Sequence, residues 1–149
     1  MTVMRSSPYN GKEVLTRLRF ALFLSLLAIS MRAAQFESAR GTLIERDGKP
    51  ALETAQHRII RLTGEDAVID VLNDERLRGT DFEALGHFSS PDHFEVAPIY
   101  ERPLFVHKDG KRLMVTYWCG TCYIRTYRPG PCWCCHKETE LDLRESVDP

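Results

Sequence analysis

The sequence predicts a mainly β protein: a small Greek-key or OB-like barrel with one short helix, followed by a C-terminal zinc-ribbon-like segment. Three observations support this prediction. Short apolar stretches that alternate with polar residues recur from Gly41 to Trp118, as in half-buried strands. Asp-Gly dipeptides, which are typical of tight hairpin turns, separate some of them. All five cysteines lie between residues 119 and 135.

Length and composition agree with one folded domain. The chain has 149 residues, of which 43% are hydrophobic and 28% charged, as in ordinary globular proteins. We predict a signal peptide over residues 1–34 and an OB-like β domain over 35–116. A cysteine-rich, zinc-ribbon-like tail is predicted over 117–143, and a charged, disordered tail over 144–149.

The N-terminal segment has the features of a secretory signal. Basic residues precede the apolar run Phe20–Ile29, and Ala28 and Ser30 have the spacing that a signal peptidase recognises. Because the run is about half of the ~20 residues that cross a bilayer, we expect no permanent membrane span. The protein is therefore predicted to be periplasmic or secreted. A true start at Met31 would instead leave it in the cytoplasm.

The first half of the predicted body contains two strands and the single helix. Gly41–Glu45 is followed by the turn dipeptide Asp47-Gly48, and His57–Leu62 forms the next apolar run. Thr63 has a side chain suited to an N-cap, and the acidic residue Asp66 follows three positions later. This pattern predicts a helix near residues 64–73.

The second half of the body contains strands only. Asp81–Leu85 and His93–Ala97 alternate apolar and polar residues. A hairpin closes the body, with Leu104–His107 as its first strand, Asp109-Gly110 as its turn and Arg112–Trp118 as its second strand. We expect these strands to form a core separate from the cysteine-rich tail.

Two segments carry a resemblance to known proteins. The run Leu77–Gly86 and the strand that ends at Ile99 resemble bacterial OB-like domains. The motifs Tyr117–Cys122 and Pro129–Cys135 resemble the tail of small exported bacterial proteins that combine an OB-like domain with a CxxC…PGPCxCC zinc-ribbon-like end. The resemblance covers residues 41–143 and implies no activity.

Four of the cysteines form two C-x-x-C pairs separated by nine residues, and these are Cys119, Cys122, Cys132 and Cys135. A structural zinc ion needs four soft ligands at tetrahedral angles, and each C-x-x-C turn directs two sulfurs toward one point. Pro129–Pro131 lies in the spacer and reverses the chain, so that the second turn faces the first. Zinc is therefore the predicted cofactor.

Other ligand sets and other chemistries remain open. Cys134 or His136 could replace one of the four ligands, and an exported protein could pair its cysteines in disulfides. Trp118–Cys122 has the W-C-G-x-C form of thioredoxin-like redox motifs. Cys132–His136 satisfies the C-x-x-C-H pattern that attaches haem c. The alternative function is accordingly a periplasmic redox or electron-transfer protein.

A partner surface is predicted in the tail, where aromatic and basic residues alternate. Its candidates are Tyr123, Arg125, Tyr127 and Arg128, which suit an unknown protein or an anionic ligand. Residues 1–30 carry a net charge of +3, so the remainder of a chain with net charge −1 carries −4. Bulk nucleic-acid binding is therefore not expected. Because no catalytic motif is present, the preferred function is a non-catalytic binding or interaction module.

Overall fold

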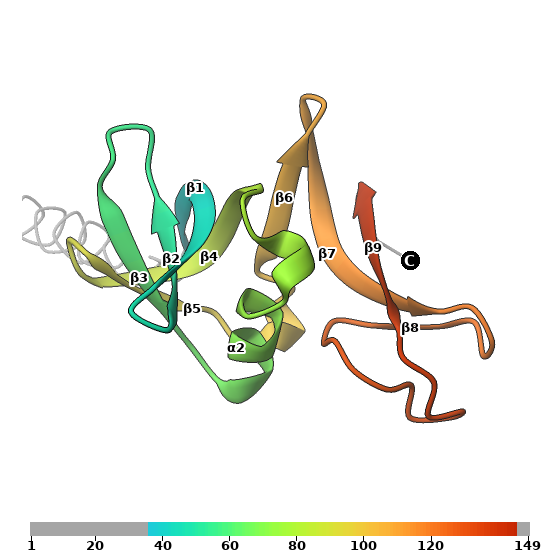
Figure 1. The fold of residues 1–149 in the computed structure, drawn as a ribbon. Helices are drawn as coiled ribbons and strands as arrows, with labels where there is room; N and C mark the ends of the chain where they lie inside the picture. The colour runs from blue at the N-terminus through green and yellow to red at the C-terminus, as the bar shows by residue number, and fades with distance from the viewer. Residues whose placement is uncertain (1–35, 146–149) are drawn as a thin grey trace, which may run out of the picture. The chain divides into compact units, whose positions relative to one another are not determined.

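The computed structural model describes residues 36–145 (Figure 1). The predicted signal peptide and residues 146–149 of the predicted tail lie outside the described residues. Figure 1 shows the barrel strands β1 to β5 on one side of the described part and strands β7 to β9 on the other. Strands β6 and β7 join the two regions.

Five strands close into a barrel, which confirms the predicted OB-like fold class. They follow the order β1-β2-β3-β5-β4, and β4 pairs back with β1 to complete the ring. All pairs are antiparallel except β3 with β5. This is the arrangement of a five-stranded Greek-key barrel. The strands are β1 (Glu37–Arg46), β2 (Lys49–Glu53), β3 (Ile59–Thr63), β4 (Asp81–Ser90) and β5 (His93–Val96).

Closure depends on β1, which pairs with two strands in succession. Its first half pairs with β4 and its second half with β2, and Thr42 takes part in both ladders. Gly41 lies at this exchange, where a Cβ atom would sit 2.5 Å from the carbonyl oxygen of Glu53. No real side chain tolerates that distance, so glycine allows the two strands to approach.

Two hairpins are closed by the Asp-Gly turns that the sequence predicts. Asp47 and Gly48 have φ angles of 54° and 73°, and Asp109 and Gly110 have φ angles of 53° and 74°. Two positive φ values in succession define a type I′ turn, whose twist matches that of the flanking strands. The second turn joins β6 (Leu104–Lys108) to β7 (Lys111–Cys119), as expected.

The predicted helix is present, but its predicted cap is wrong. Helix α2 (Asp66–Leu72) has Glu65 as its N-cap residue, with no side-chain hydrogen bond there. Thr63 is the last residue of β3 and donates its hydroxyl to the carbonyl oxygen of Phe94. Strand pairing therefore holds it before the N-cap position, where it cannot cap the helix. Short 3-10 turns follow at η1 (Glu75–Leu77) and η2 (Ile99–Glu101). Within residues 36–145, no helix has the length and apolar character needed to cross a membrane.

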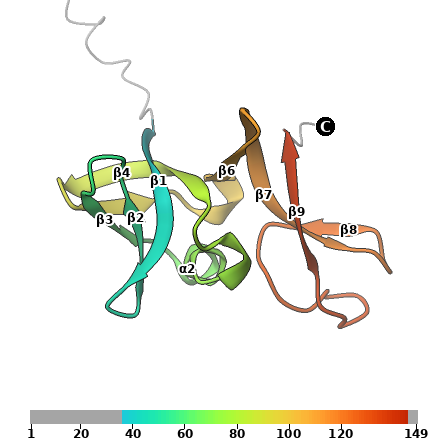
Figure 2. The ribbon, with the colours of Figure 1, turned by 45° about the horizontal axis from the view of Figure 1, so that its top comes forward.

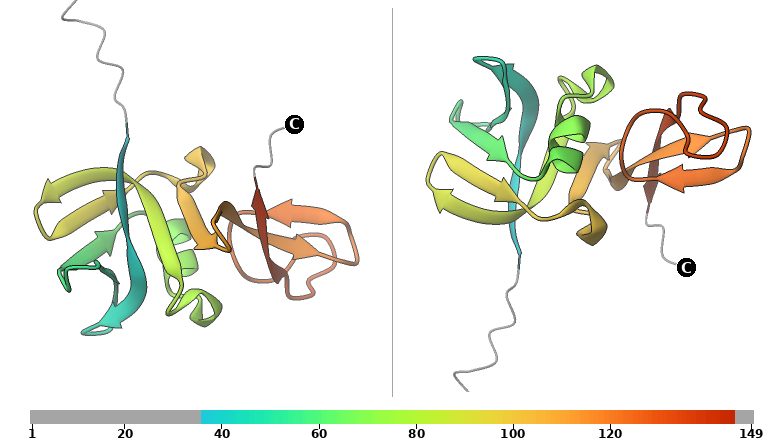
Figure 3. Two further views of the ribbon diagram at one scale, coloured as in Figure 1. Left: turned by 90° about the horizontal axis from the view of Figure 1, so that it is seen from above. Right: turned by 90° about the horizontal axis from the view of Figure 1, so that it is seen from below.

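The C-terminal region is a small sheet around β7. Strands β8 (Ile124–Thr126) and β9 (Glu140–Glu145) both pair with β7 in antiparallel fashion (Figure 3). Sequence reasoning missed both strands, and it also missed β2. Since β9 continues through Arg144 and Glu145, these two residues are paired, whereas the sequence predicted a frayed tail from residue 144.

One core serves both regions, which corrects the expectation of a separate core for the body. Tyr117 and Val115 of β7 are buried in the same cluster as Leu43 and Phe82 of the barrel. The β9 side chains Leu141 and Leu143 pack against this cluster. Figure 2 shows α2 between the barrel strands and the strands β7 to β9. The predicted domain boundary at residues 116 and 117 falls inside β7.

A carboxylate on β4 connects four strands on the outside of the barrel. Glu83 accepts hydrogen bonds from Ser38 at 2.9 Å, from His107 at 2.6 Å and from two guanidinium nitrogens of Arg112 at 2.9 and 3.1 Å. Its side chain is only 12% exposed. Burial alone would raise the pKa of Glu83, but the bonds from Arg112, His107 and Ser38 outweigh burial and lower the pKa to about 2.

The first prediction follows from this lowered pKa. At pH 7, Glu83→Gln should reduce the free energy of unfolding by about 1–3 kcal/mol, because charge-assisted bonds are lost. A lowered folded-state pKa stabilises the fold above the ordinary value of 4.5, and this stabilisation is lost as pH falls toward about 2. The difference between wild type and variant should therefore shrink between these two pH values in urea denaturation curves.

Glu95→Gln is the matched control, since Glu95 is an exposed carboxylate on the neighbouring strand β5. It should change the free energy of unfolding little at any pH. A Glu83→Gln effect that does not vary with pH would contradict the role assigned to the ionised carboxylate.

Candidate metal centre

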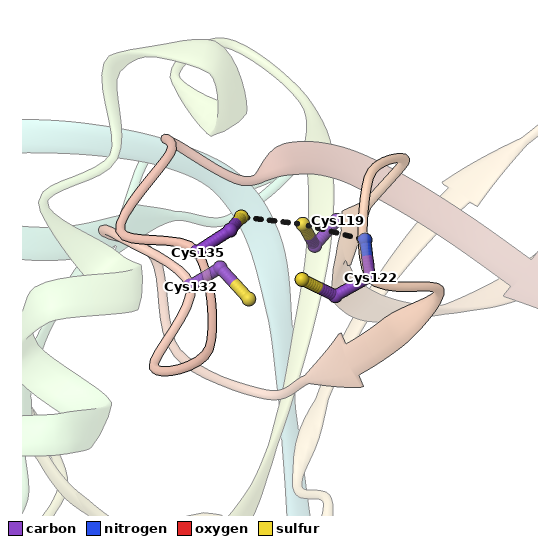
Figure 4. Close-up of side chains that lie close together, drawn as sticks. All are labelled: Cys119, Cys122, Cys132 and Cys135. Carbon is purple, nitrogen blue, oxygen red and sulfur yellow. Dashed lines mark hydrogen bonds between the residues drawn. The ribbon is translucent and has the colours of Figure 1, made fainter.

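Four cysteine sulfurs from two turns converge in the C-terminal region. The Sγ atoms of Cys119, Cys122, Cys132 and Cys135 all lie within 4.8 Å of one another. Figure 4 shows the pair from the first C-x-x-C turn facing the pair from the second. Cys119 and Cys132 are buried, and Cys122 and Cys135 are half-buried. The structure thus brings together the four predicted ligands, although they span 17 positions of the chain.

The two C-x-x-C turns have the same backbone conformation. In the first, the N–H of Tyr123 donates to the carbonyl oxygen of Cys119 at 2.9 Å. In the second, the N–H of His136 donates to the carbonyl oxygen of Cys132 at 2.8 Å. Tyr123 and His136 both adopt left-handed backbone angles, with φ of 56° and 57°. Such angles are uncommon for residues other than glycine, so their occurrence at the same position indicates that both turns place their two cysteines in the same way.

Backbone pairing holds the residues on both sides of each turn. The first turn connects β7 to β8, and the pairing of Cys119 with Ile124 closes it. The second turn is braced by Pro131, which forms an isolated bridge with Glu138. Next to that bridge, the Thr139 hydroxyl donates to the carbonyl oxygen of Gly130 at 2.8 Å. The sulfurs are therefore positioned by backbone pairing.

The spacing of the sulfurs suits a tetrahedral metal ion. With zinc–sulfur bonds of about 2.3 Å, the sulfurs of a tetrahedral site lie roughly 3.8 Å apart. The Sγ atoms of Cys119 and Cys135 are 3.5 Å apart, and the largest separation in the cluster stays within 4.8 Å. The N–H of Cys122 donates to Sγ of Cys119 at 3.4 Å, so this contact holds the first two ligand candidates together. The four cysteines are thus close enough to hold a metal ion.

The pKa of the Cys122 thiol is raised within the cluster. A hydrogen bond with Cys134, then burial, and then the thiols of Cys135 and Cys132 raise the pKa of Cys122 above its ordinary value. Metal ligation requires deprotonated sulfur, so a bound cation would have to overcome this effect and would release protons. If all four sulfurs were ionised, they would repel one another unless a cation lay between them.

The two alternative ligands lie outside the group of four. Cys134 is exposed, between the second-turn ligands in sequence, and interacts with Cys122 at the edge of the cluster. His136 is exposed and occupies the left-handed position after Cys135. Neither residue belongs to the four-sulfur group.

Three observations on the described residues bear on the alternative interpretations of the cysteines. All five cysteines are free thiols, so no disulfide is present. The first C-x-x-C turn leads into strand β8, and no helix N-terminus is available to stabilise a reactive thiolate at Cys119. Cys132 and Cys135 direct their sulfurs toward the other pair, as Figure 4 shows.

Sequence reasoning missed a hydrogen-bonded connection between the metal centre and the barrel. The Tyr117 hydroxyl, next to the first turn, donates to the carboxylate of Asp74 at 2.9 Å. Arg76 binds the same carboxylate at 2.7 Å and also donates to the carbonyl oxygen of Thr139, beside the second turn, at 3.5 Å. Burial would raise the pKa of Asp74, but the bonds from Arg76 and Tyr117 lower it. The carboxylate thus stays ionised and connects both regions.

Two of the predicted partner residues are half-buried and two are exposed. Arg125 is only 14% exposed; it donates to Asp142 and Thr116 and stacks over Trp118. Tyr127 lies against the guanidinium of Arg102. Two further candidates, Tyr123 and Arg128, are exposed.

A further exposed aromatic side chain, outside the four predicted partner residues, lies in the second turn. Trp133 is 72% exposed, and it directly follows the ligand candidate Cys132.

Comparison with known proteins adds no relative. No family model, curated protein or solved structure matches this chain. The class of protein is therefore defined by its own fold and site: a closed five-stranded barrel with a four-cysteine cluster on an attached sheet. The resemblance to exported OB-like proteins with a zinc-ribbon-like tail stays a prediction.

The second prediction concerns the ligand set. Replacing Cys119, Cys122, Cys132 or Cys135 with Ser should remove most of the bound metal, because three thiolates no longer close the tetrahedron. Hydrogen exchange should then accelerate across residues 117–137. Metal content by elemental analysis and exchange by mass spectrometry measure both effects.

Cys134→Ser is the control, and it should keep metal and exchange protection near the wild-type level. Equal loss of metal from Cys134→Ser and Cys135→Ser would show that the second ligand pair is assigned wrongly. In that case His136 would be the next ligand to replace.

Proposed function

We propose that this protein is a non-catalytic, exported binding or interaction module whose C-terminal region is held by a structural zinc ion. The observation that carries the proposal is the convergence of four cysteine sulfurs from two equivalent turns. A site with four protein ligands leaves no open position for water or substrate, which is the arrangement of structural zinc centres. Its contribution is folding free energy, supplied where the chain buries little apolar surface.

Zinc suits these ligands better than the other common metals. Four thiolates are soft donors in a tetrahedral arrangement, a set typical of zinc or iron–sulfur chemistry, whereas calcium and magnesium prefer oxygen ligands. Zinc does not change its oxidation state, so its coordination geometry stays constant. This suits ligands that strand pairing holds in place. The ligands of the ion would be Cys119 and Cys122 on the first turn and Cys132 and Cys135 on the second.

A binding role is supported by what surrounds the site. The exposed aromatic residues Tyr123 and Trp133 each lie on or next to one of the two turns. Side chains of this kind are enriched among the residues that dominate protein interfaces. A metal that fixes the two turns would hold both rings on rigid supports, which lowers the entropic cost of binding a partner.

The third prediction separates zinc from the alternative redox or haem function. Protein produced with an intact N-terminus and recovered from the periplasm of a bacterial host should contain one equivalent of zinc and no visible absorption band. Elemental analysis and an absorption spectrum on one sample provide the measurement. Haem c at Cys132–His136 would give an intense visible band, and zinc-free protein with oxidised thiols would favour disulfides.

The fourth prediction concerns export, which the proposal takes from the leader sequence. The exported protein should begin between Met31 and Phe36, since cleavage after the small residues near Ala28 removes the apolar run. N-terminal sequencing of periplasmic material tests this. Recovered protein that begins at Met1 would contradict a cleaved signal and favour an anchored or cytoplasmic chain.

A further inference from the structure

A groove runs beside the second cysteine turn, outside the metal centre. It has a volume of about 340 Å³ and is lined by Thr126, Arg128, Pro129, Pro131 and Trp133. Thr126 ends β8, Arg128, Pro129 and Pro131 belong to the loop that follows, and Trp133 lies in the second turn itself. The groove is therefore a feature of the metal-held region, and the metal ligands are not among its walls.

Its apolar walls are rigid. Pro129 and Pro131 have fixed φ angles, and Thr139 holds the intervening Gly130 through the carbonyl oxygen of that residue. Trp133 adds an indole ring that is 72% exposed. An exposed aromatic ring in a groove is the kind of surface on which extended, proline-containing peptides pack at low entropic cost.

Its polar end carries one positive charge. A terminal nitrogen of the Arg128 guanidinium lies 2.5 Å from a carboxylate oxygen of Asp70 on α2, and the arginine side chain is 59% exposed. A guanidinium has five N–H donors, so the contact with Asp70 leaves others for a second carboxylate. Thr126, by contrast, donates its hydroxyl to the carbonyl oxygen of Arg128 and helps to fix the loop.

We propose that this groove binds an extended peptide segment of a partner protein, one that places a proline or similar apolar side chain on Trp133 and a carboxylate on Arg128. The proposal rests on the proposed function, because it names the partner of that binding module. Charge favours a peptide over nucleic acid. The described residues carry a net charge of −4, and Arg128 is the one cation among the five groove residues, whereas a nucleic-acid backbone requires several.

The fifth prediction is a binding experiment on the full mature chain, loaded with zinc. The probe is a fluorescein-labelled peptide of repeated Pro-Pro-Glu units, and its binding is measured by fluorescence anisotropy. Trp133→Ala and Arg128→Gln should each weaken binding about tenfold, as for central residues of an interface. Asp70→Asn should strengthen it severalfold, because it releases Arg128 from its internal partner.

Matched controls are available on the same chain. Tyr100 is 73% exposed, nearly as much as Trp133, but it does not line the groove, so Tyr100→Ala should bind within about twofold of wild type. Arg46→Gln removes an exposed arginine on β1 and should behave in the same way. A Pro-Pro-Gln peptide should bind more weakly than the Pro-Pro-Glu peptide.

Several outcomes overturn the proposal. The proposal fails if the Pro-Pro-Glu peptide does not bind, or if its Gln counterpart binds equally well. It also fails if the Trp133→Ala or Arg128→Gln variant binds the peptide as the control variants do. Tighter binding of oligothymidine to the same groove would assign the surface to nucleic acid. Zinc content and circular dichroism are recorded on each sample. Loss of peptide binding with both unchanged refutes only the peptide proposal, and a zinc-free native protein refutes the proposed function itself.

Discussion

The pairing of β9 with β7 is the interaction on which the arrangement of this protein depends. Its register places Glu140 opposite Trp118, one residue before Cys119. Because only four residues separate Cys135 from Glu140, this pairing returns the second cysteine turn to the first. Without it, the sulfurs would belong to two unconnected loops. The four-cysteine cluster is thus a consequence of strand pairing, and an ion bound there would strengthen the pairing in return.

The same strand makes the two regions interdependent. On β7, Tyr117 contributes its ring to the barrel core and its hydroxyl to Asp74, while the adjacent Trp118 and Cys119 belong to the cysteine-rich region. A structural metal in a region with its own core would stabilise that region alone. Here the contacts of Asp74 and Arg76 end beside the two turns, so the cysteine cluster is coupled to the shared core.

Electrostatics is managed by local pairing. The described residues carry an excess of acids, yet the half-buried carboxylates of Glu83, Asp74 and Asp142 each have an arginine partner that lowers their pKa despite burial. Such pairs satisfy groups that burial would otherwise make costly. They also occupy most of the arginines near the metal centre, including Arg125, which sequence reasoning had assigned to a partner. Arg128 remains more open than Arg125, since its side chain is 59% exposed against 14%.

The sequence by itself determined the β class, the two Asp-Gly hairpin turns, the position of the helix and the four cysteines of the cluster. Each of these depends on short-range chemistry: side-chain alternation, the positive φ angles of Asp-Gly, or the reach of a C-x-x-C turn. Only the tertiary structure decided which strands pair, and so it revealed β9 and the shared core around Tyr117. It also decided which carboxylate each paired arginine contacts. These features join residues that are far apart in the chain, such as Asp74 with Tyr117 and Arg128 with Asp70. Local sequence patterns hold no information on such pairs, because their energy comes from burial and contacts that exist only once the chain has folded.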